Sequence, residues 1–318
     1  MKLRVLGING NTPVVSIGGL TLAGVLQSVD QGRSQDAVVA VDLDRQALRA
    51  AKKAKALNQK AVLVRFEPAV VCPLNYDKRA LRNFDSVIDV GRNFVESSGI
   101  EFWPQHWPSI KDEAVWLIED RLNAACLVNA NKLSFIPGEL YSLRRDVIDA
   151  GLVDTYGHGW DMAINTRLKK FVIELMIAVR SSRGISLKAG RGWFRDRLAT
   201  KGPIDDKLAT MASYKVAVVI ENSADYISEK LLDAIFAGCI PVYVGPDPID
   251  WGLSESLYIK AEANFESIQS AIGKALDMDT KAFSAAVDGF LRDRENCIKW
   301  DAHMVFQRLA NLIVESVS

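Results

Sequence analysis

Residues 214–245 read YKVAVVIENSADYISEKLLDAIFAGCIPVYVG and predict a strand, a helix and a second strand in close succession. The apolar runs at 214–220 and 240–245 are short and rich in valine and isoleucine, which is typical of buried strands in a parallel sheet. Residues 226–237 between them have a helical pattern, and Gly238 follows as a stop signal. We therefore expect one βαβ crossover, since neighbouring parallel strands need a connection of this kind.

Similar alternation extends over most of the chain. We expect strands at 37–41, 61–66, 84–90, 126–129 and 153–156, and helices at 20–29, 44–57, 139–150 and 166–179. Strands that alternate with helices of this length indicate βαβ units and parallel sheets. The chain has 318 residues, which suffices for two domains on the usual prior of ~100–200 residues each.

The composition predicts a folded protein of the cytoplasm. Apolar residues make up 49% and charged residues 25%, so a sizeable core can form and extended disorder is not expected. The 39 basic and 39 acidic residues cancel, which argues against a nucleic-acid partner held by the overall charge. The cysteines, at 72, 126, 239 and 297, lack the paired spacing of a disulfide framework or zinc site and are expected to be reduced. Neither a signal peptide nor a membrane-spanning run is evident.

Polar residues follow the strand at 214–220, at the edge where ligands bind in open α/β sheets. Ser223 or Asp225 is expected to cap the following helix, and Glu229 suits the positive end of its dipole. Lys230 is electrostatically disfavoured in the same turn unless an anion binds there with it. A diphosphate is the natural candidate for that anion, and a solvent-exposed lysine without a role is the alternative.

These residues resemble the signature of glycosyltransferase family 10, the α-1,3/4-fucosyltransferases that use GDP-fucose. The residues that carry the resemblance are Tyr214-Lys215, Glu221-Asn222-Ser223, Tyr226-Ile227-Ser228-Glu229-Lys230 and Ile240-Pro241-Val242 ahead of Gly245. Ser228 stands where the family usually has threonine, and Val216 where it has phenylalanine. A thinner resemblance covers Arg144-Arg145 ahead of Val153-Asp154-Thr155-Tyr156-Gly157, and Phe66-Glu67-Pro68 ahead of Asn83-Phe84-Asp85.

The resemblance implies an α/β fold of the GT-B type, with two Rossmann-like domains facing across a cleft. On this basis residues 1–122 form an acceptor-side domain, 123–299 a nucleotide-sugar domain, and 300–318 a C-terminal helix that could pack back on the N-terminal domain. The implied activity is transfer of L-fucose from GDP-fucose to a glycan hydroxyl in an α-1,3/4-type linkage, with inversion at the anomeric carbon. The alternatives are a GT-B enzyme with another nucleotide sugar and a catalytically silent protein that binds nucleotide sugars.

The resemblance also implies roles for individual residues. Glu67 matches the family's glutamate before proline and is the candidate general base, while an ordinary surface glutamate before a turn is the alternative. The implied donor-binding residues are Arg144 or Arg145 and Lys230 for the diphosphate, Asn222 and Glu229 for donor hydroxyls, and Tyr226 for the nucleotide sugar. Either arginine can be aligned with the arginine-bearing helix of the family, and Arg145 is slightly preferred as the residue that contacts the diphosphate. For Glu221 a structural role at the strand end is as plausible as a ligand role.

No cofactor is required by this chemistry, and no metal is expected. Asp42-Leu43-Asp44 has the Asp-x-Asp form that binds metal in another glycosyltransferase architecture. Because it lies between an apolar run and a helix, Asp44 is better interpreted as a helix N-cap. The histidines, at 106, 158 and 303, are too scattered for a metal site.

One basic segment is not covered by the resemblance. Between Arg180 and Lys201 there are seven lysines and arginines and a single acid, with Trp193 and Phe194 among them. A mobile solvated loop is the simplest interpretation. The alternatives are a contribution to GDP binding and a peripheral contact of residues 180–201 with anionic lipid at the inner face of the membrane. The expected partners are a nucleotide-sugar donor and an oligosaccharide or lipopolysaccharide-type acceptor.

Overall fold

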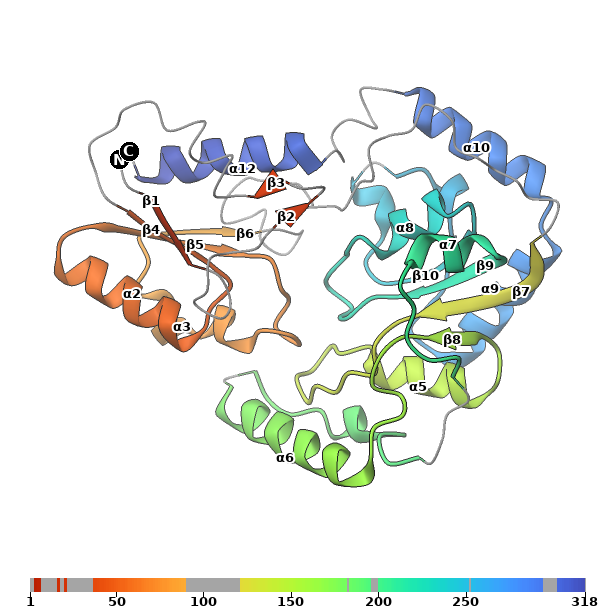
Figure 1. Cartoon of the computed structure of the whole chain (residues 1–318), viewed down its shortest axis with the longest axis horizontal. Helices are drawn as coiled ribbons and strands as arrows, with labels where there is room; N and C mark the ends of the chain where they lie inside the picture. The colour runs from red at the N-terminus through yellow and green to blue at the C-terminus, as the bar shows by residue number, and fades with distance from the viewer. Residues whose placement is uncertain are drawn as a thin grey trace. The chain divides into compact units, whose positions relative to one another are not determined.

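The computed structural model divides the chain into two compact units, each of which contains a parallel sheet covered by helices (Figure 1). Unit 1 comprises Met1–Ile110 and Glu295–Ser318, and unit 2 comprises Lys111–Arg294. The sequence places these boundaries at 122 and 299 instead. The structure describes residues 3–6, 16–17, 20–21, 37–89, 121–181, 183–195, 200–251, 253–293 and 302–317.

The sheet of unit 1 has four parallel strands in the order β1-β4-β5-β6. Their bounds are Leu3–Leu6, Ala37–Val41, Lys60–Arg65 and Ser86–Asp89. β4 is buried along its whole length, which explains its unbroken apolar sequence. A separate antiparallel pair joins β2 (Ser16–Ile17) to β3 (Leu20–Thr21). β3 stands where the sequence predicts the start of a helix at 20–29, and residues 22–29 lie outside the described part.

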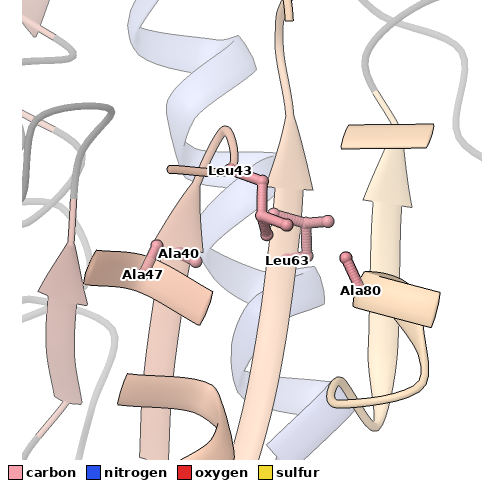
Figure 2. Close-up of a cluster of buried hydrophobic side chains, with 5 residues drawn as sticks. All are labelled: Ala40, Leu43, Ala47, Leu63 and Ala80. Atoms are coloured by element: carbon pink, nitrogen blue, oxygen red, sulfur yellow. The ribbon is translucent and has the colours of Figure 1, made fainter. Parts of the chain in front are cut away.

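Small side chains let a helix lie close to the sheet of unit 1. α2 (Arg45–Ala56) packs on β4 and β5 through alanines, and α3 (Lys78–Leu81) follows the 3₁₀ turn η1 (Pro73–Tyr76). Figure 2 shows the resulting cluster of buried side chains, which consists of Ala40, Leu43, Ala47, Leu63 and Ala80. These residues come from β4, the turn after it, α2, β5 and α3, so one cluster joins the helices to the strands.

The C-terminal helix covers the other face of the same sheet. α12 (Ala302–Val317) packs against β5 and β6, opposite α2 and α3 (Figure 1). Phe306, Leu309, Ala310 and Ile313 on this helix are fully buried. Their spacing of three and four residues places them on one face. Thus the last residues of the chain complete the core of unit 1.

The sheet of unit 2 has five parallel strands in the order β11-β10-β9-β7-β8. Their bounds are Ile259–Lys260, Ile240–Val244, Tyr214–Ile220, Leu122–Val128 and Asp154–Tyr156. The chain leaves β7 for β8 on one side and returns to β9 on the other. The strand order therefore reverses between β7 and β9, which makes this point a topological switch.

The helices in the described part of unit 2 are α5 (Tyr141–Asp149), α6 (Ile164–Arg180), α7 (Lys207–Ala212), α8 (Lys230–Phe236), α9 (Phe265–Asp277) and α10 (Thr280–Arg292). Short 3₁₀ turns are η3 (Leu187–Gly190), η4 (Pro248–Trp251) and η5 (Glu255–Leu257). Across the described residues, no helix combines the length and apolar character that a membrane crossing requires.

The predicted crossover is confirmed as β9, α8 and β10, and the two strands pair in parallel from Val216 opposite Ile240 to Ile220 opposite Val244. Most element bounds lie within two residues of those predicted, and the starts of α8 and β7 differ more. α8 begins at Lys230 rather than at 226, and β7 begins at Leu122 rather than at 126. The late start of α8 has a cause in the polar residues that precede it, described below.

Candidate functional site

The strand ends at the topological switch bring the predicted site of unit 2 together. β7 and β9 lie side by side, with Cys126 opposite Ala217, so the segments that follow them leave the sheet at the same edge. Residues 129–131 follow β7, and residues 221–223 follow β9. Ligands of open α/β sheets bind at such an edge, outside the carboxyl ends of the strands where the order reverses.

The loops at this edge are tightly fitted to each other. Gly157, just after β8, has a φ of +130°, and a Cβ there would lie 2.2 Å from the carbonyl oxygen of Asn129. That oxygen also accepts a hydrogen bond of 2.7 Å from the indole Nε1 of Trp160. Only glycine permits this approach, because it combines a positive φ with the absence of a side chain. The segments after β7 and β8 are therefore closely packed against each other at this edge.

Arg144 extends from α5 to the end of β9. Its Nη2 donates to the carbonyl oxygen of Ile220 at 2.6 Å and to Oδ1 of Asn222 at 3.0 Å, and its guanidinium lies 4.9 Å from the centre of the Tyr141 ring. The side chain is buried, and its Nε has no hydrogen-bond partner. Burial lowers the pKa of Arg144, while the nearby Tyr141 and Glu221 act in the opposite direction. Two predicted site residues, Arg144 and Asn222, are thus in direct contact.

Arg145 points elsewhere, although it is the next residue on the same helix. Its guanidinium donates to three carbonyl oxygens, those of Lys132 (2.9 Å), Ala189 (2.5 Å) and Arg191 (2.9 Å). It also lies 5.6 Å from the centre of the Trp193 ring, and burial lowers its pKa to about 10. The contacts of Arg145 therefore do not favour it as the phosphate ligand, because its guanidinium holds the loop at 183–195 by hydrogen bonds.

A buried carboxylate organises the start of α8. Glu221 is fully buried, its Oε1 accepts the backbone N–H of Ser228 at 2.8 Å, and its Oε2 accepts the Ser228 hydroxyl at 2.7 Å. Lys230 Nζ lies 3.3 Å from the same Oε2 and donates to the Ser228 Oγ at 2.6 Å. The lysine side chain is only 14% exposed. The solvent-exposed interpretation of Lys230 is therefore wrong.

The same cluster explains why α8 starts late. The N–H of Ser228 is bound by Glu221, seven residues earlier, so residues 226–228 stay outside the helix. Ser223 and Asp225, the expected caps, hydrogen-bond to each other instead. Glu229 occupies the position just before the helix, and its carbonyl oxygen accepts the N–H of Asp233. Glu221 also balances the charge of Lys230, so this lysine does not require a bound anion.

The end of β10 closes over Glu221. A Cβ on Gly245 would lie 2.4 Å from the Tyr243 hydroxyl and 2.8 Å from Cγ of Glu221. The Tyr243 hydroxyl is buried without a hydrogen-bond partner, and burial raises the pKa of Tyr243 well above its usual value. The sequence left the role of Glu221 open between the fold and the ligand, and it did not single out Tyr243. A glutamate directly after an apolar strand was the available signal for the first, because such a carboxylate needs partners when buried.

The other predicted donor residues lie around this cluster. Tyr226 and Glu229 are half-buried in the turn before α8, and Asn222 is buried beside Arg144. Lys230 lies beside them because its ammonium group contacts Glu221, which directly precedes Asn222. The structure therefore brings Arg144, Asn222 and the start of α8 to one edge, whereas Arg145 belongs to the packing of the neighbouring loop.

Glu67 belongs to unit 1, where its main chain is held on both sides. Asp42 is buried after β4 with a φ of +52°, and its Oδ1 accepts the N–H groups of Phe66 (2.9 Å) and Glu67 (3.0 Å). The Glu67 carbonyl oxygen accepts from Asn75 Nδ2 and from the Tyr76 hydroxyl, both at 3.3 Å. The Glu67 side chain is half-buried. This turn gives the candidate base a fixed main-chain position.

The Asp-x-Asp segment has a structural explanation. Asp44 is the N-cap of α2, and its carboxylate accepts the N–H of Ala47 at 2.6 Å, as predicted. Asp42 also accepts from Asn75 Nδ2 at 2.6 Å, and burial raises its pKa despite these hydrogen bonds. In the part of the chain that is described, no group of three or more His, Cys, Asp or Glu side chains is arranged to hold a metal ion.

Asp154 and Tyr156 on β8 serve the sheet rather than the site. The Tyr214 hydroxyl donates to Asp154 Oδ2 at 2.8 Å and lies 2.8 Å from the Tyr156 hydroxyl. Lys201 forms an ion pair with Asp154 at 2.8 Å, and this contact lowers the pKa of the aspartate. β7 lies between β8 and β9, so these contacts link β8 to β9 across it.

The basic segment is folded where the structure describes it. Trp193 is buried and its Nε1 donates to the carbonyl oxygen of Arg167 at 3.0 Å. Arg167 in turn donates to the carbonyl oxygen of Arg195 at 2.7 Å. Trp193 and Ala189 are thus buried anchors of this segment, while Leu187, Lys188 and Arg191 stay exposed.

Comparisons with known proteins show the fold. No family model and no curated protein matches the chain. Anabaena HepE in complex with UDP and glucose has a TM-score of 0.51 at 14% identity, covering 96% of this chain and 84% of that one. An E. coli protein described as trehalose-6-phosphate, bound with UDP-2-fluoro glucose, has a TM-score of 0.50 at 11% identity. The match covers 93% of this chain and 75% of that one. An α1,3-fucosyltransferase has a TM-score of 0.39 at 13% identity, covering 84% and 75%, which is too distant to carry an argument.

The first two similarities extend over nearly the whole chain. They are similarities to GT-B glycosyltransferases, and the parallel sheets of the two units agree with that architecture. The predicted α/β fold of the GT-B type, with two Rossmann-like domains, is confirmed.

Proposed function

We propose that the protein is an inverting glycosyltransferase that moves L-fucose from GDP-fucose to a glycan hydroxyl in an α-1,3/4-type linkage. In this proposal unit 2 binds the donor, and Glu67 of unit 1 acts as the general base. The observation that carries the proposal is the contact between Arg144 and Asn222 at the switch between β7 and β9. The resemblance of residues 214–245 to glycosyltransferase family 10 supports the choice of donor.

Arg144 is the proposed ligand of the diphosphate. Its Nη2 is occupied by Ile220 and Asn222, but its buried Nε donates to nothing. A buried donor without a partner costs about 1–3 kcal/mol, so a shift of the side chain that brings this Nε to a ligand oxygen would be favoured. Planar guanidinium groups bind phosphate oxygens through charge-assisted hydrogen bonds.

Lys230 is the second proposed phosphate ligand. An ammonium group has three N–H donors, and the hydrogen bonds to Ser228 and Glu221 use two of them. The third can meet a phosphate oxygen without breaking the cluster. Glu221 keeps the ammonium group in place, as a positioning residue does. Asn222 and Glu229 are assigned to donor hydroxyls, and Tyr226 to the nucleotide sugar.

The proposed reaction is a single displacement. The acceptor oxygen attacks the anomeric carbon as its proton passes to the Glu67 carboxylate. The bond from that carbon to the phosphate oxygen breaks, and its electron pair leaves with GDP. Arg144 and Lys230 stabilise the negative charge that grows on the departing diphosphate. The β-linked donor thus yields an α-linked product.

A different nucleotide sugar is the second candidate. HepE and the E. coli protein have UDP or a UDP-sugar bound in the structures that resemble this chain. At 14% and 11% identity that similarity concerns the fold, so a UDP-sugar is an alternative that the assay must include.

A donor-hydrolysis screen tests the proposal. Purified protein is incubated with GDP-fucose, GDP-mannose and UDP-glucose in turn, and release of the nucleotide diphosphate is measured. Hydrolysis of GDP-fucose above the others is the expected result. Faster hydrolysis of UDP-glucose would replace the proposed donor, and no hydrolysis with measurable GDP binding would identify a silent binding protein.

The role of Glu67 is tested in the transfer reaction. Glu67→Gln keeps the shape of the side chain but removes proton acceptance, so turnover should fall ~10²–10⁴-fold. GDP affinity and melting temperature should stay unchanged. Glu266→Gln, on the exposed first turn of α9, is the matched control. Near-wild-type turnover of Glu67→Gln would remove Glu67 from the mechanism.

A further inference from the structure

α6 exposes a continuous apolar face to solvent. Leu168, Val172 and Met176 are 48%, 54% and 48% exposed, and each is four residues from the next. Ile173 and Val179 on the same helix are 53% and 63% exposed. Single exposed apolar side chains are common, but residues spaced by three and four form one surface. Figure 1 shows α6, in green, at the periphery of unit 2.

The exposed face is not the one that attaches α6 to its unit. The helix is attached through Arg167, Phe171 and Ala178. Arg167 donates to the carbonyl oxygens of Trp160 (3.0 Å) and Met162 (2.9 Å). Phe171 meets Phe135 edge-on with ring centres 4.9 Å apart. The helix therefore already has a packed side, and the outward apolar side chains add nothing to the core.

Cationic side chains border this face. Lys169, Lys170 and Arg180 are exposed on α6, and Lys188 and Arg191 are exposed in the segment that follows. Glu174 is the only acid in the sequence from 164 to 195. It is half-buried, and burial raises its pKa. Leu187, next to Lys188, is 79% exposed, so the combination of apolar and cationic side chains continues beyond the helix.

We propose that the outward face of α6, with residues 185–191, docks on the surface of an anionic lipid bilayer. A helix of 17 residues is about 25 Å long and would lie parallel to the bilayer plane. Leu168, Val172 and Met176 enter the interface between headgroups and acyl chains, and Lys169, Lys170 and Arg180 extend to the phosphates at its border.

The charge of the surface selects this partner over a second copy of the chain. In a twofold dimer the same patch meets itself, so the cations of both copies would be brought together. Glu174 is half-buried and cannot balance them. Anionic lipid supplies both the apolar layer and the opposite charge. The sequence suggests a membrane contact for residues 180–201, and the proposal extends that contact to α6. It does not depend on the identity of the donor sugar.

Vesicle flotation tests the proposal with the full chain. The wild-type protein should bind vesicles of phosphatidylcholine with phosphatidylserine, bind vesicles of phosphatidylcholine alone much more weakly, and be released at high salt. Leu168→Ser with Met176→Ser should lower the partition coefficient at least ~10-fold. Lys169→Gln with Lys170→Gln should lower it about fivefold per charge.

Matched controls come from exposed residues elsewhere in unit 2. Ile249→Ser removes a side chain that is 50% exposed on η4, and Lys274→Gln with Lys281→Gln removes two exposed cations. Both control variants should bind vesicles as the wild type does. The melting temperature of each α6 variant should be unchanged, since the altered side chains are in solvent.

Three outcomes would overturn the proposal: no binding of the wild-type protein to anionic vesicles at low salt, α6 variants that bind as the wild type does, or a dimeric wild-type protein that the α6 substitutions make monomeric. The last result would assign the face to a second copy. Hydrolysis of soluble GDP-fucose, measured on the same variants without vesicles, should be unaffected. The membrane proposal and the proposed function can therefore fail separately.

Discussion

The pairing of Lys230 with Glu221 allows stability and donor binding to be separated by mutation. Lys230→Met removes the ammonium group and leaves the fully buried carboxylate with only the two donors of Ser228. Breaking a buried ion pair costs about 3–5 kcal/mol, and we expect the lower end because Ser228 remains. For a unit of this size that corresponds to a fall of about 6–12 °C in the melting temperature of unit 2.

The double variant Glu221→Gln with Lys230→Met removes both charges. Its melting temperature should return most of the way to the wild-type value, because no uncompensated charge is left in the interior. GDP affinity should nevertheless stay about 5- to 150-fold below that of the wild type, which is the loss of one charge-assisted contact of ~1–3 kcal/mol. Calorimetric titration with GDP and thermal unfolding measure the two effects, and Lys274→Met on the exposed face of α9 is the control.

Two results would refute this reasoning. If the double variant binds GDP as tightly as the wild type, Lys230 is not a phosphate ligand and serves only Glu221. If Lys230→Met unfolds at the wild-type temperature, the ion pair contributes nothing to the stability of unit 2.

Three more predictions follow from particular contacts. Gly157→Ala should prevent native folding of unit 2, because a Cβ there lies 2.2 Å from the Asn129 carbonyl oxygen; a variant with wild-type near-UV circular dichroism would rule out that close approach. Burial raises the pKa of Asp42 above 3.8, so the folded state favours the protonated form and the stability of unit 1 should fall as pH rises from 3.8. Asp42→Asn should flatten that dependence in denaturant unfolding at successive pH values; an unchanged slope would argue against the burial effect. Transfer activity should persist in excess EDTA, and complete loss that Mn²⁺ restores would reveal a missed metal site.

Much of the fold could be predicted from the sequence, because strands buried on both faces appear as short apolar runs. The strands at Ala37–Val41 and Tyr214–Ile220 have the predicted bounds. The start of α8 could not be predicted in this way. It depends on Glu221, which binds the N–H of Ser228 across seven residues and so overrides the local capping signals of Ser223 and Asp225.

The site could be predicted only in part, for a similar reason. Arg144 and Arg145 are adjacent, and successive helical side chains point about 100° apart, so one faces the strand ends and the other the loop at 183–195. Sequence alone does not say which. The same limit applies to α6: its helical pattern was predicted, but the side that packs on unit 2 became known only from contacts such as Phe171 with Phe135.

The structure of the protein with GDP bound tests the central claim most directly. We predict that the diphosphate lies beyond the carboxyl ends of β7 and β9, with phosphate oxygens within hydrogen-bond distance of Arg144 Nε and Lys230 Nζ. A diphosphate bound elsewhere on unit 2, or one at this edge that contacts neither side chain, would contradict it.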